Sequence, residues 1–223
     1  GPMHQCIARV DLNHSLAQQT FLIRLHAPAI AAGIRPGQFV MLRLLGHSDP
    51  LLGRPFALYD IVPDDAGQPS GIDVVYLVIG KATALMSQLR PGDEVSVWGP
   101  LGNGFPEPEA ADHVALVAGG IGQTPFLAHV RELLGQRGYA GQAARRRVDR
   151  VSLYYGVRSA AFAAGVADFQ NAGAQVHLAS NDGTIGHHGL VTELLDLHIP
   201  LPRQLYGCGP GPMLHALAAL AQR

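Results

Sequence analysis

Cysteine is nearly absent from this sequence, which holds only Cys6 and Cys208 among its 223 residues. Two cysteines so far apart along the chain do not form the closely spaced framework of a disulfide-stabilised secreted domain. Their scarcity is typical of proteins from a reducing compartment. We therefore expect a cytoplasmic protein whose stability comes from a packed core.

Charge is also scarce, since Asp, Glu, Lys and Arg make up 15% of the residues, against about 25% in a typical domain. The net charge is −1, and the one basic cluster, at residues 145–150, is expected to be a solvated loop. No apolar run approaches the ~18 residues of a membrane-spanning helix, and no signal-peptide pattern is found. The sequence therefore predicts neither a nucleic-acid partner nor a membrane partner.

The first half of the chain has the pattern of short β-strands. Apolar and polar residues alternate, and the segments are separated by Gly- and Pro-rich turns. The opening Gly-Pro-Met resembles a tag-cleavage remnant followed by a native methionine, so we place this domain at residues 3–106. One helix is expected at 82–89. The expected fold is a six-stranded antiparallel (Greek-key) barrel, with strands at 6–12, 20–27, 38–45, 55–62, 72–79 and 94–99.

The second half, residues 107–223, alternates between buried strands and helical segments. A Pro-rich stretch at 105–108 marks the boundary between the two halves. Four strand–helix repeats predict a parallel sheet with helices on both faces. The expected strands are 113–119, 151–157, 174–180 and 204–209.

A glycine-rich turn, "AGGIGQTP", follows the first strand of the second half. Its spacing, Gly120-x-Gly122-x-x-Pro125, departs from the dinucleotide-binding pattern G-x-G-x-x-G. We expect Thr124 to cap the following helix and Pro125 to occupy its first turn. Glycine amides at a helix start favour a pyrophosphate, although such a turn can also be purely structural.

Two further strand ends carry candidate residues. Cys208 and Gly209 end the last strand and should lie beside the first glycine turn, because ligands of α/β sheets bind at the carboxyl ends of strands. No base is apparent that would activate the thiol, so packing or ligand positioning is favoured over a nucleophilic role. Arg158 follows the second strand, where it could hold a 2′-phosphate or lie on the surface, and the choice between NADH and NADPH stays open.

Arg54 in "LLGRPFALYD" is unusual for a core strand, because a buried guanidinium normally needs an anionic partner. Gly80 and Thr83 begin the expected helix of the same domain. The three residues could converge on a second pyrophosphate, with Phe56 stacked on a flat ring. The alternative is an arginine at the barrel rim and a phenylalanine in the core.

Together the motifs resemble those of the ferredoxin–NADP reductase superfamily along nearly the whole chain. The matching motifs, in order, are "RPGQFVML", "RPFALYD", "IGKATALMSQLRPGDEVSVWGPLGNGF", "AGGIGQTP", "YYGVRS", "NDGTIGHHGLVTELL" and "CGPGPM". Within the superfamily the chain is most similar to the electron-transfer (FAD/iron–sulfur) subunits of dihydroorotate dehydrogenases.

The resemblance implies an FAD-binding barrel followed by an NAD(P)-binding domain. Hydride would pass from NADH or NADPH to the flavin, and electrons would leave to a partner, the FMN-containing dihydroorotate dehydrogenase catalytic subunit of pyrimidine biosynthesis. The implied FAD-binding residues are Arg54, Pro55, Phe56, Ala57, Val75, Tyr76, Leu77, Gly80, Ala82 and Thr83. The implied NAD(P)-binding residues are Gly120, Gly122, Gln123, Thr124, Arg158, Cys208 and Gly209.

Three departures from the family pattern leave alternatives open. Ala57 stands where the family has a serine that hydrogen-bonds near flavin N5, and Ala82 replaces a glycine at the phosphate. Two cysteines cannot supply the four ligands of the 2Fe–2S cluster of these subunits, so this chain is expected to hold no metal. Either a cluster segment has been removed or the chain is a short homologue. A stand-alone ferredoxin, flavodoxin or flavin reductase, or a redox-impaired regulatory subunit, remain the alternatives.

Overall fold

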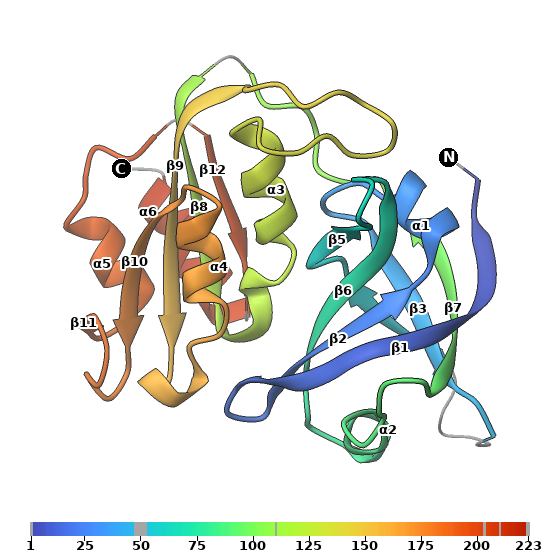
Figure 1. Cartoon of the computed structure of the whole chain (residues 1–223). Coiled ribbons are helices and arrows are strands. Elements are labelled where there is room, and N and C mark those ends of the chain that lie inside the picture. Colours follow the sequence, from blue (N-terminus) through green and yellow to red (C-terminus); the bar gives the residue numbers. More distant parts are fainter. Residues whose placement is uncertain (1, 47–52, 110, 203, 210, 222–223) are drawn as a thin grey trace. The chain divides into compact units, whose positions relative to one another are not determined.

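The computed structural model describes residues 2–46, 53–109, 111–202, 204–209 and 211–221. The chain divides into two compact units. The first combines Gly1–Pro106 with Arg137–Ala144, and the second combines Glu107–Gln136 with Arg145–Arg223. Figure 1 labels the elements of both units. The segment Arg137–Ala144 thus groups with the first unit although its flanking residues belong to the second.

The described part of the first unit forms one curled antiparallel sheet of seven strands, in the order β4-β3-β7-β1-β2-β6-β5; Figure 1 labels these strands. The inward positions are filled by buried aliphatic side chains such as Ile23, Val40, Val74 and Val97. The strands are β1 (His4–Ala17), β2 (Thr20–His26), β3 (Phe39–Leu44), β4 (Arg54–Ala57), β5 (Asp60–Pro63), β6 (Pro69–Leu77) and β7 (Glu94–Leu101), with helices α1 (Pro28–Gly33) and α2 (Lys81–Met86). The expected antiparallel barrel is confirmed as a half-barrel.

The single strand expected at 55–62 was wrong, because the chain changes its hydrogen-bonding partner in the middle of that segment. Before the change, β4 pairs with β3, and the amide of Leu58 donates to the carbonyl of Gln38 at 3.1 Å. After it, the amide of Tyr59 donates to Asp73 at 2.9 Å, and β5 pairs with β6. One alternating apolar run therefore makes two strands, which lie at opposite edges of the sheet.

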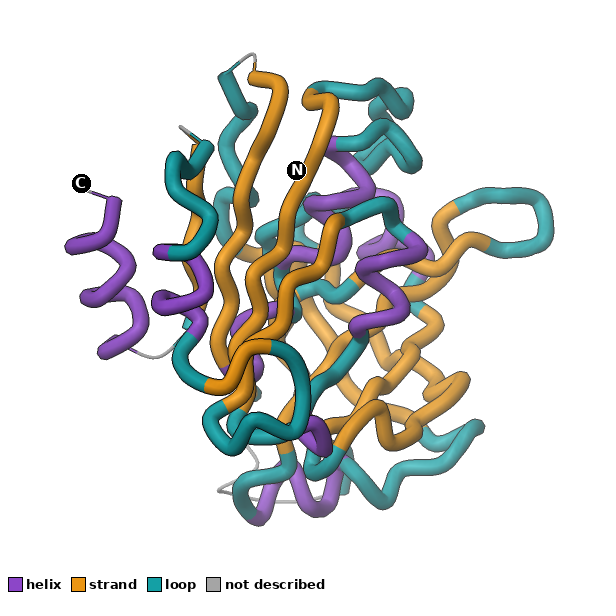
Figure 2. Tube along the Cα trace, turned by 90° about the vertical axis from the view of Figure 1, so that its left-hand side faces the viewer, coloured by secondary structure: helices purple, strands orange, loops and turns teal. Residues whose placement is uncertain are grey.

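The second unit contains a parallel sheet whose described strands follow the order β11-β10-β9-β8-β12. Helices α3 and α4 cover one face, and α5 and α6 cover the other (Figures 1 and 2), which confirms the expected α/β architecture. The elements are β8 (Ala111–Gly119), α3 (Phe126–Leu133), β9 (Val148–Val157), α4 (Val166–Asn171), β10 (Gln175–Ser180), β11 (His187–His188), α5 (Val191–Asp196), β12 (Gln204–Cys208) and α6 (Gly211–Ala221), with 3-10 turns at Gly120–Gln123 and Ala160–Phe162.

The basic cluster at 145–150 is not simply a solvated loop. The side chain of Arg147 is only 9% exposed and lies 3.0 Å from a carboxylate oxygen of Glu132 and 3.5 Å from one of Glu107. Arg145, in contrast, is largely exposed. The expectation failed for Arg147 because its two acidic partners are distant in sequence and make its burial tolerable.

No helix in the described ranges is both long and apolar enough to span a bilayer. Among the same residues, no group of three or more His, Cys, Asp or Glu side chains is arranged to hold a metal ion.

His129 on α3 is buried in this unit, with 2% of its surface exposed. Burial, assisted by the positive charge of Arg147, lowers the pKa of His129 from 6.5 to about 3. Its ring meets that of Tyr206 edge-on, with the centroids 6.1 Å apart. The imidazole is therefore neutral in the folded protein at ordinary pH.

We predict that acid destabilises the second unit through His129. As the pH falls below 6.5, His129 binds a proton in the unfolded chain, whereas in the folded chain it stays neutral until about pH 3. Stability present above pH 6.5 is therefore lost progressively across this window. The loss for this residue reaches about 2 kcal/mol at pH ~5. Urea unfolding monitored by far-ultraviolet circular dichroism at neutral and acidic pH measures it.

His129→Phe keeps an aromatic ring against Tyr206 and removes the titration, so its stability should depend less on pH. Part of the dependence should remain, because burial also lowers the pKa values of His113 and His177. The control His14→Gln alters an exposed histidine of the other unit. An unchanged pH dependence in His129→Phe would contradict the prediction.

Candidate functional site

A pocket in the first unit brings together residues that the sequence predicted from two separate segments. Arg54 and Phe56 come from β4, and Ala82 and Thr83 come from α2. The rest of its wall is aliphatic or thioether, formed by Ile23, Leu42, Leu44, Met86 and Val95. The empty volume is about 390 Å³. The pocket thus combines an apolar wall, one aromatic ring and one cationic side chain.

Arg54 is exposed, which agrees with the alternative of an arginine at the rim of the barrel. It begins β4, an edge strand whose ladder partner is β3, with Arg54 opposite Leu42. Pro55 is also exposed, and it suits an edge strand because it has no N–H to donate to a second neighbour. Edge placement puts the positive charge at the pocket without the cost of burial.

Phe56 is half-buried, and its ring meets that of Tyr76 nearly edge-on, with the centroids 6.3 Å apart. The Tyr76 hydroxyl donates to the side-chain oxygen of Asn13 at 2.8 Å. Burial raises the pKa of Tyr76 well above its usual value, so the phenol stays neutral. Tyr76 therefore supports Phe56 from within the core.

The start of α2 is held by the Thr83 side chain. Its hydroxyl oxygen accepts hydrogen bonds from the amides of Ile79, at 3.0 Å, and Gly80, at 3.1 Å. The first-turn amides of a helix have no acceptor inside the helix and are suited to an anion. The Thr83 hydroxyl thus fixes this helix start.

Six predicted FAD-binding residues do not line the pocket. Val75 and Tyr76 are buried in the core of the half-barrel, and Leu77 is half-buried at the end of β6. Pro55, Ala57 and Gly80 flank the lining residues along the chain.

The second unit has a larger pocket, of about 940 Å³ of empty space, at the carboxyl ends of β8, β9 and β10. Of the predicted nucleotide-binding residues, Gly120 and Arg158 line it. The other lining residues are Gly119, Gly156, Val157, Asn181, Leu190, Val191, Thr192 and Met213. Asn181 could have been found from the sequence, because it directly follows a strand, as Arg158 does. Leu190, Thr192 and Met213 reach the pocket from helix starts and carry no such signal.

Arg158 is exposed, and its guanidinium carbon lies 4.2 Å from the centre of the Phe162 ring. This cation–π contact orients the side chain while leaving its N–H groups available. The following loop is held by the amide of Ala160, which donates to the Thr184 hydroxyl at 2.8 Å. Arg158 is therefore a positioned cation at the pocket.

Thr124 does not cap a helix, which corrects the sequence expectation. The chain leaves β8 through the 3-10 turn Gly120–Gln123, and Pro125, in helical geometry, precedes α3. Thr124 is buried, and so is Gln123, whose side-chain amide donates to the carbonyl of Ala164 at 3.2 Å. Both side chains brace the interior of the unit.

The two glycine loops lie side by side, as expected from the sequence. A Cβ on Gly122 would collide with the backbone carbonyl of Cys208, and a Cβ on Gly209 would lie 3.1 Å from the amide nitrogen of Gly119. Burial raises the pKa of the Cys208 thiol, which keeps it protonated and poorly nucleophilic. These glycines are required for close packing of the strand ends β8 and β12.

Comparison with known proteins identifies the chain's relatives. It is 33% identical over 216 residues to the dihydroorotate dehydrogenase B (NAD(+)) electron transfer subunit of Desulforamulus reducens, covering 96% of this chain and 76% of that protein. The Geobacillus kaustophilus subunit is 37% identical over 204 residues, covering 91% and 74%. This chain belongs to that family. The resemblance inferred from the ordered motifs is therefore confirmed, although no family model matches the chain.

Solved structures share the fold. An NADH-dependent reduced ferredoxin–NADP oxidoreductase superposes with a TM-score of 0.78 at 24% identity, over 98% of this chain and 73% of that one. The cytochrome b5 reductase domain of Ulva prolifera nitrate reductase gives a TM-score of 0.72 at 16% identity, over 98% and 92%. The assignment of individual residues to a flavin or a nicotinamide nucleotide stays a prediction.

We predict that Gly122→Ala lowers the stability of the second unit by about 1–3 kcal/mol, the usual cost of overpacking. The added methyl would force Cys208 and the 3-10 turn apart. Gly211→Ala is the matched control, because a Cβ there meets nothing within 4 Å. In urea unfolding, the first variant should have the lower midpoint, and equal midpoints for the two variants would refute the packing argument.

Proposed function

We propose that this chain is a flavoprotein oxidoreductase that passes electrons from NADH or NADPH, through FAD, to a redox partner. The observation that carries the proposal is the convergence of Arg54, Phe56 and Thr83 on one largely apolar pocket. Their segments are separated by more than twenty positions of sequence, so the fold and not local sequence brings them together. Residues 3–106 would form the FAD-binding domain, and 107–223 the NAD(P)-binding domain.

The side chains at this pocket offer the charge and the aromatic surface that parts of FAD require. The Arg54 guanidinium would donate hydrogen bonds to the pyrophosphate, because its planar arrangement of N–H groups matches two phosphate oxygens at once. The first-turn amides of α2, whose preceding residue Gly80 is held by Thr83, would donate to the same group. Phe56, braced by Tyr76, offers a ring against which a flat heterocycle can pack.

When bound, FAD supplies the chemistry that accepts a hydride as an electron pair and releases electrons one at a time. The residues of this chain would bind and orient it and keep water from the ring. Ala57 cannot donate the hydrogen bond that the family's serine supplies, so a water or backbone amide would have to replace it.

In the second unit, the pocket at Gly120 and Arg158 would take the nicotinamide nucleotide. Gly120 has a φ of +59° and a Cβ position with no neighbour within 4 Å, so its backbone is open to a phosphate. The oriented Arg158 guanidinium supplies positive charge for phosphate oxygens. The other predicted nucleotide-binding residues would support this pocket by packing next to its lining; they are Gly122, Gln123, Thr124, Cys208 and Gly209.

The proposed partner is the catalytic subunit of a dihydroorotate dehydrogenase. The support is the shared name of the relatives, which are electron transfer subunits of dihydroorotate dehydrogenase B (NAD(+)). Anaerobic mixing of the FAD-loaded protein with NADH or NADPH tests the donor, because the visible flavin absorbance bleaches on reduction. Adding an FMN-containing catalytic subunit then tests onward transfer. Bound flavin that neither nucleotide reduces would favour a redox-impaired regulatory subunit.

We predict that Arg54→Met weakens FAD binding about 10- to 100-fold, which is the loss expected for a charge-assisted hydrogen bond to a phosphate. Fluorescence titration of FAD into the flavin-free protein measures the dissociation constant.

Arg43→Met is the matched control, because Arg43 is an exposed arginine on the neighbouring strand β3 and does not line the pocket. It should leave the dissociation constant unchanged. Equal FAD affinity in Arg54→Met and the unaltered protein would remove Arg54 from the proposed site.

A further inference from the structure

Asp60, the first residue of β5, is a carboxylate in the interior of the first unit, with 5% of its surface exposed. One of its oxygens accepts hydrogen bonds from the amide of Ile61, at 2.8 Å, and the hydroxyl of Tyr139, at 2.7 Å. The other accepts one from the guanidinium of Arg137, at 2.7 Å. Both side-chain donors come from the segment Arg137–Ala144, which we call the clasp.

The charge of Arg137 matters because a second buried carboxylate lies opposite Asp60. Asp73 is its direct cross-strand partner on β6 and is 6% exposed. Arg24 of β2 neutralises Asp73 through two hydrogen bonds, of 2.8 and 3.0 Å. Like charges opposite each other in a sheet repel. Arg137 therefore gives Asp60 its own counter-charge, as Arg24 does for Asp73.

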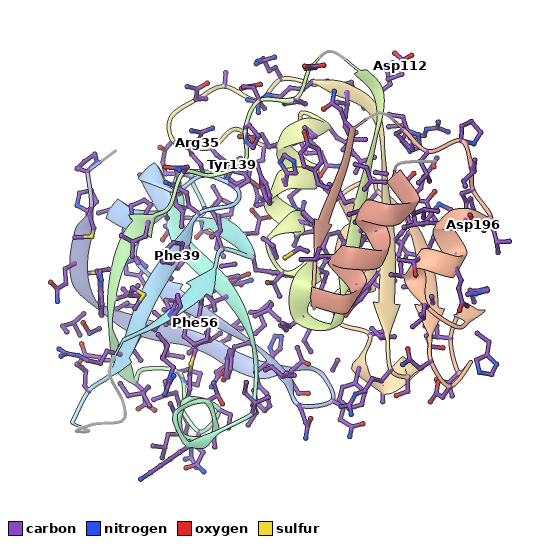
Figure 3. The ribbon with its side chains drawn as sticks, turned by 180° about the vertical axis from the view of Figure 1, so that it is seen from behind. Arg35, Phe39, Phe56, Asp112, Tyr139 and Asp196 are labelled. Atoms are coloured by element: carbon purple, nitrogen blue, oxygen red, sulfur yellow. The ribbon has the colours of Figure 1, made fainter. Side chains whose placement is uncertain are left out.

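The clasp has a compact shape that presents both donors to β5. Tyr139 is 2% exposed, and its carbonyl accepts the amide of Gln142 at 3.0 Å, which closes a turn. A Cβ on Gly138 would collide with the carbonyl of Gln142, so the turn depends on a glycine there. Arg137 also donates to the carbonyl of Ile61 at 3.0 Å. Tyr139 and Phe56 are both labelled in Figure 3.

Asp60 follows β4, the strand that carries Arg54 and Phe56, after a short corner formed by two buried residues, Leu58 and Tyr59. As an edge strand, β4 is held laterally by its ladder with β3. The corner fixes the carboxyl end of β4. The corner itself ends at Asp60, which the clasp holds through Arg137 and Tyr139. Loss of the clasp contacts would loosen the corner and, with it, Arg54 and Phe56.

We propose that Arg137 and Tyr139 are positioning residues for the FAD pocket, acting through Asp60 on the strand that carries Arg54 and Phe56. The inference rests on the proposed FAD-binding function. It assigns to the sequence of the second half of the chain a part in building the flavin site of the first.

The test uses the full chain and two variants, Tyr139→Phe and Arg137→Met. Tyr139→Phe removes a single hydroxyl and keeps the buried ring, so it is the variant expected to fold normally. Each variant should bind FAD about tenfold more weakly, a coupling typical of connected networks. Hydrogen exchange at the amides of Leu58 and Tyr59 should accelerate in both. Arg137→Lys, which keeps the charge, should recover part of the affinity.

Arg145→Met is the control, since it makes the same chemical change at an exposed arginine just beyond the clasp. It should bind FAD as the unaltered protein does. Lower thermal stability with unchanged FAD affinity in Tyr139→Phe and Arg137→Met would mean a purely structural clasp and would overturn the inference. If the unaltered protein itself bound no FAD, the proposed function would fail first, a result distinguishable from failure of the clasp alone.

Discussion

The proposed FAD pocket depends on the change of pairing partner at Leu58 and Tyr59. Those two amides donate to carbonyls on different strands, Gln38 before β3 and Asp73 on β6. The chain therefore leaves one edge of the curled sheet and joins the other within two residues. The ladder with β3 holds Arg54 and Phe56 along β4, and the corner ends that ladder at its carboxyl side.

In the second unit, the proposed nucleotide pocket depends on glycines that let two turns approach closely. Parallel strands bring their carboxyl ends to one edge of the sheet, but side chains at those ends would keep the loops apart. Gly122 against Cys208, and Gly209 against Gly119, allow the turns after β8 and β12 to touch. The pocket is then lined by Gly120 and by residues that follow β9 and β10. Gly122 therefore serves the packing of the two loops, whereas Gly120 lines the pocket.

Most strands and helices, and the order of the two folds, follow from local patterns, because alternation and turn residues are properties of neighbouring positions. The failures concern residues whose environment is set by distant partners. Arg147 was expected in solvent and is buried because Glu132 and Glu107 come to it. Threonine is a common helix-capping residue, yet Thr124 directly follows the 3-10 turn Gly120–Gln123 and does not cap α3. In the first pocket, Arg54, Phe56, Ala82 and Thr83 line one space although they come from two separate segments, and their role in binding FAD stays a prediction.

The chain passes from one unit to the other near the boundary expected at 105–108. It passes between the units twice more, at the start and at the end of the clasp. A buried ion pair is a weak source of net stability, because desolvation offsets most of the attraction. Its stronger effect is on specificity, since a misplaced clasp would leave Asp60 beside Asp73 without its arginine. The carboxylate therefore penalises alternative placements of the loop more than it stabilises the native one. An apolar side chain at the start of β5 would carry no such penalty and would specify the placement of the clasp less strongly.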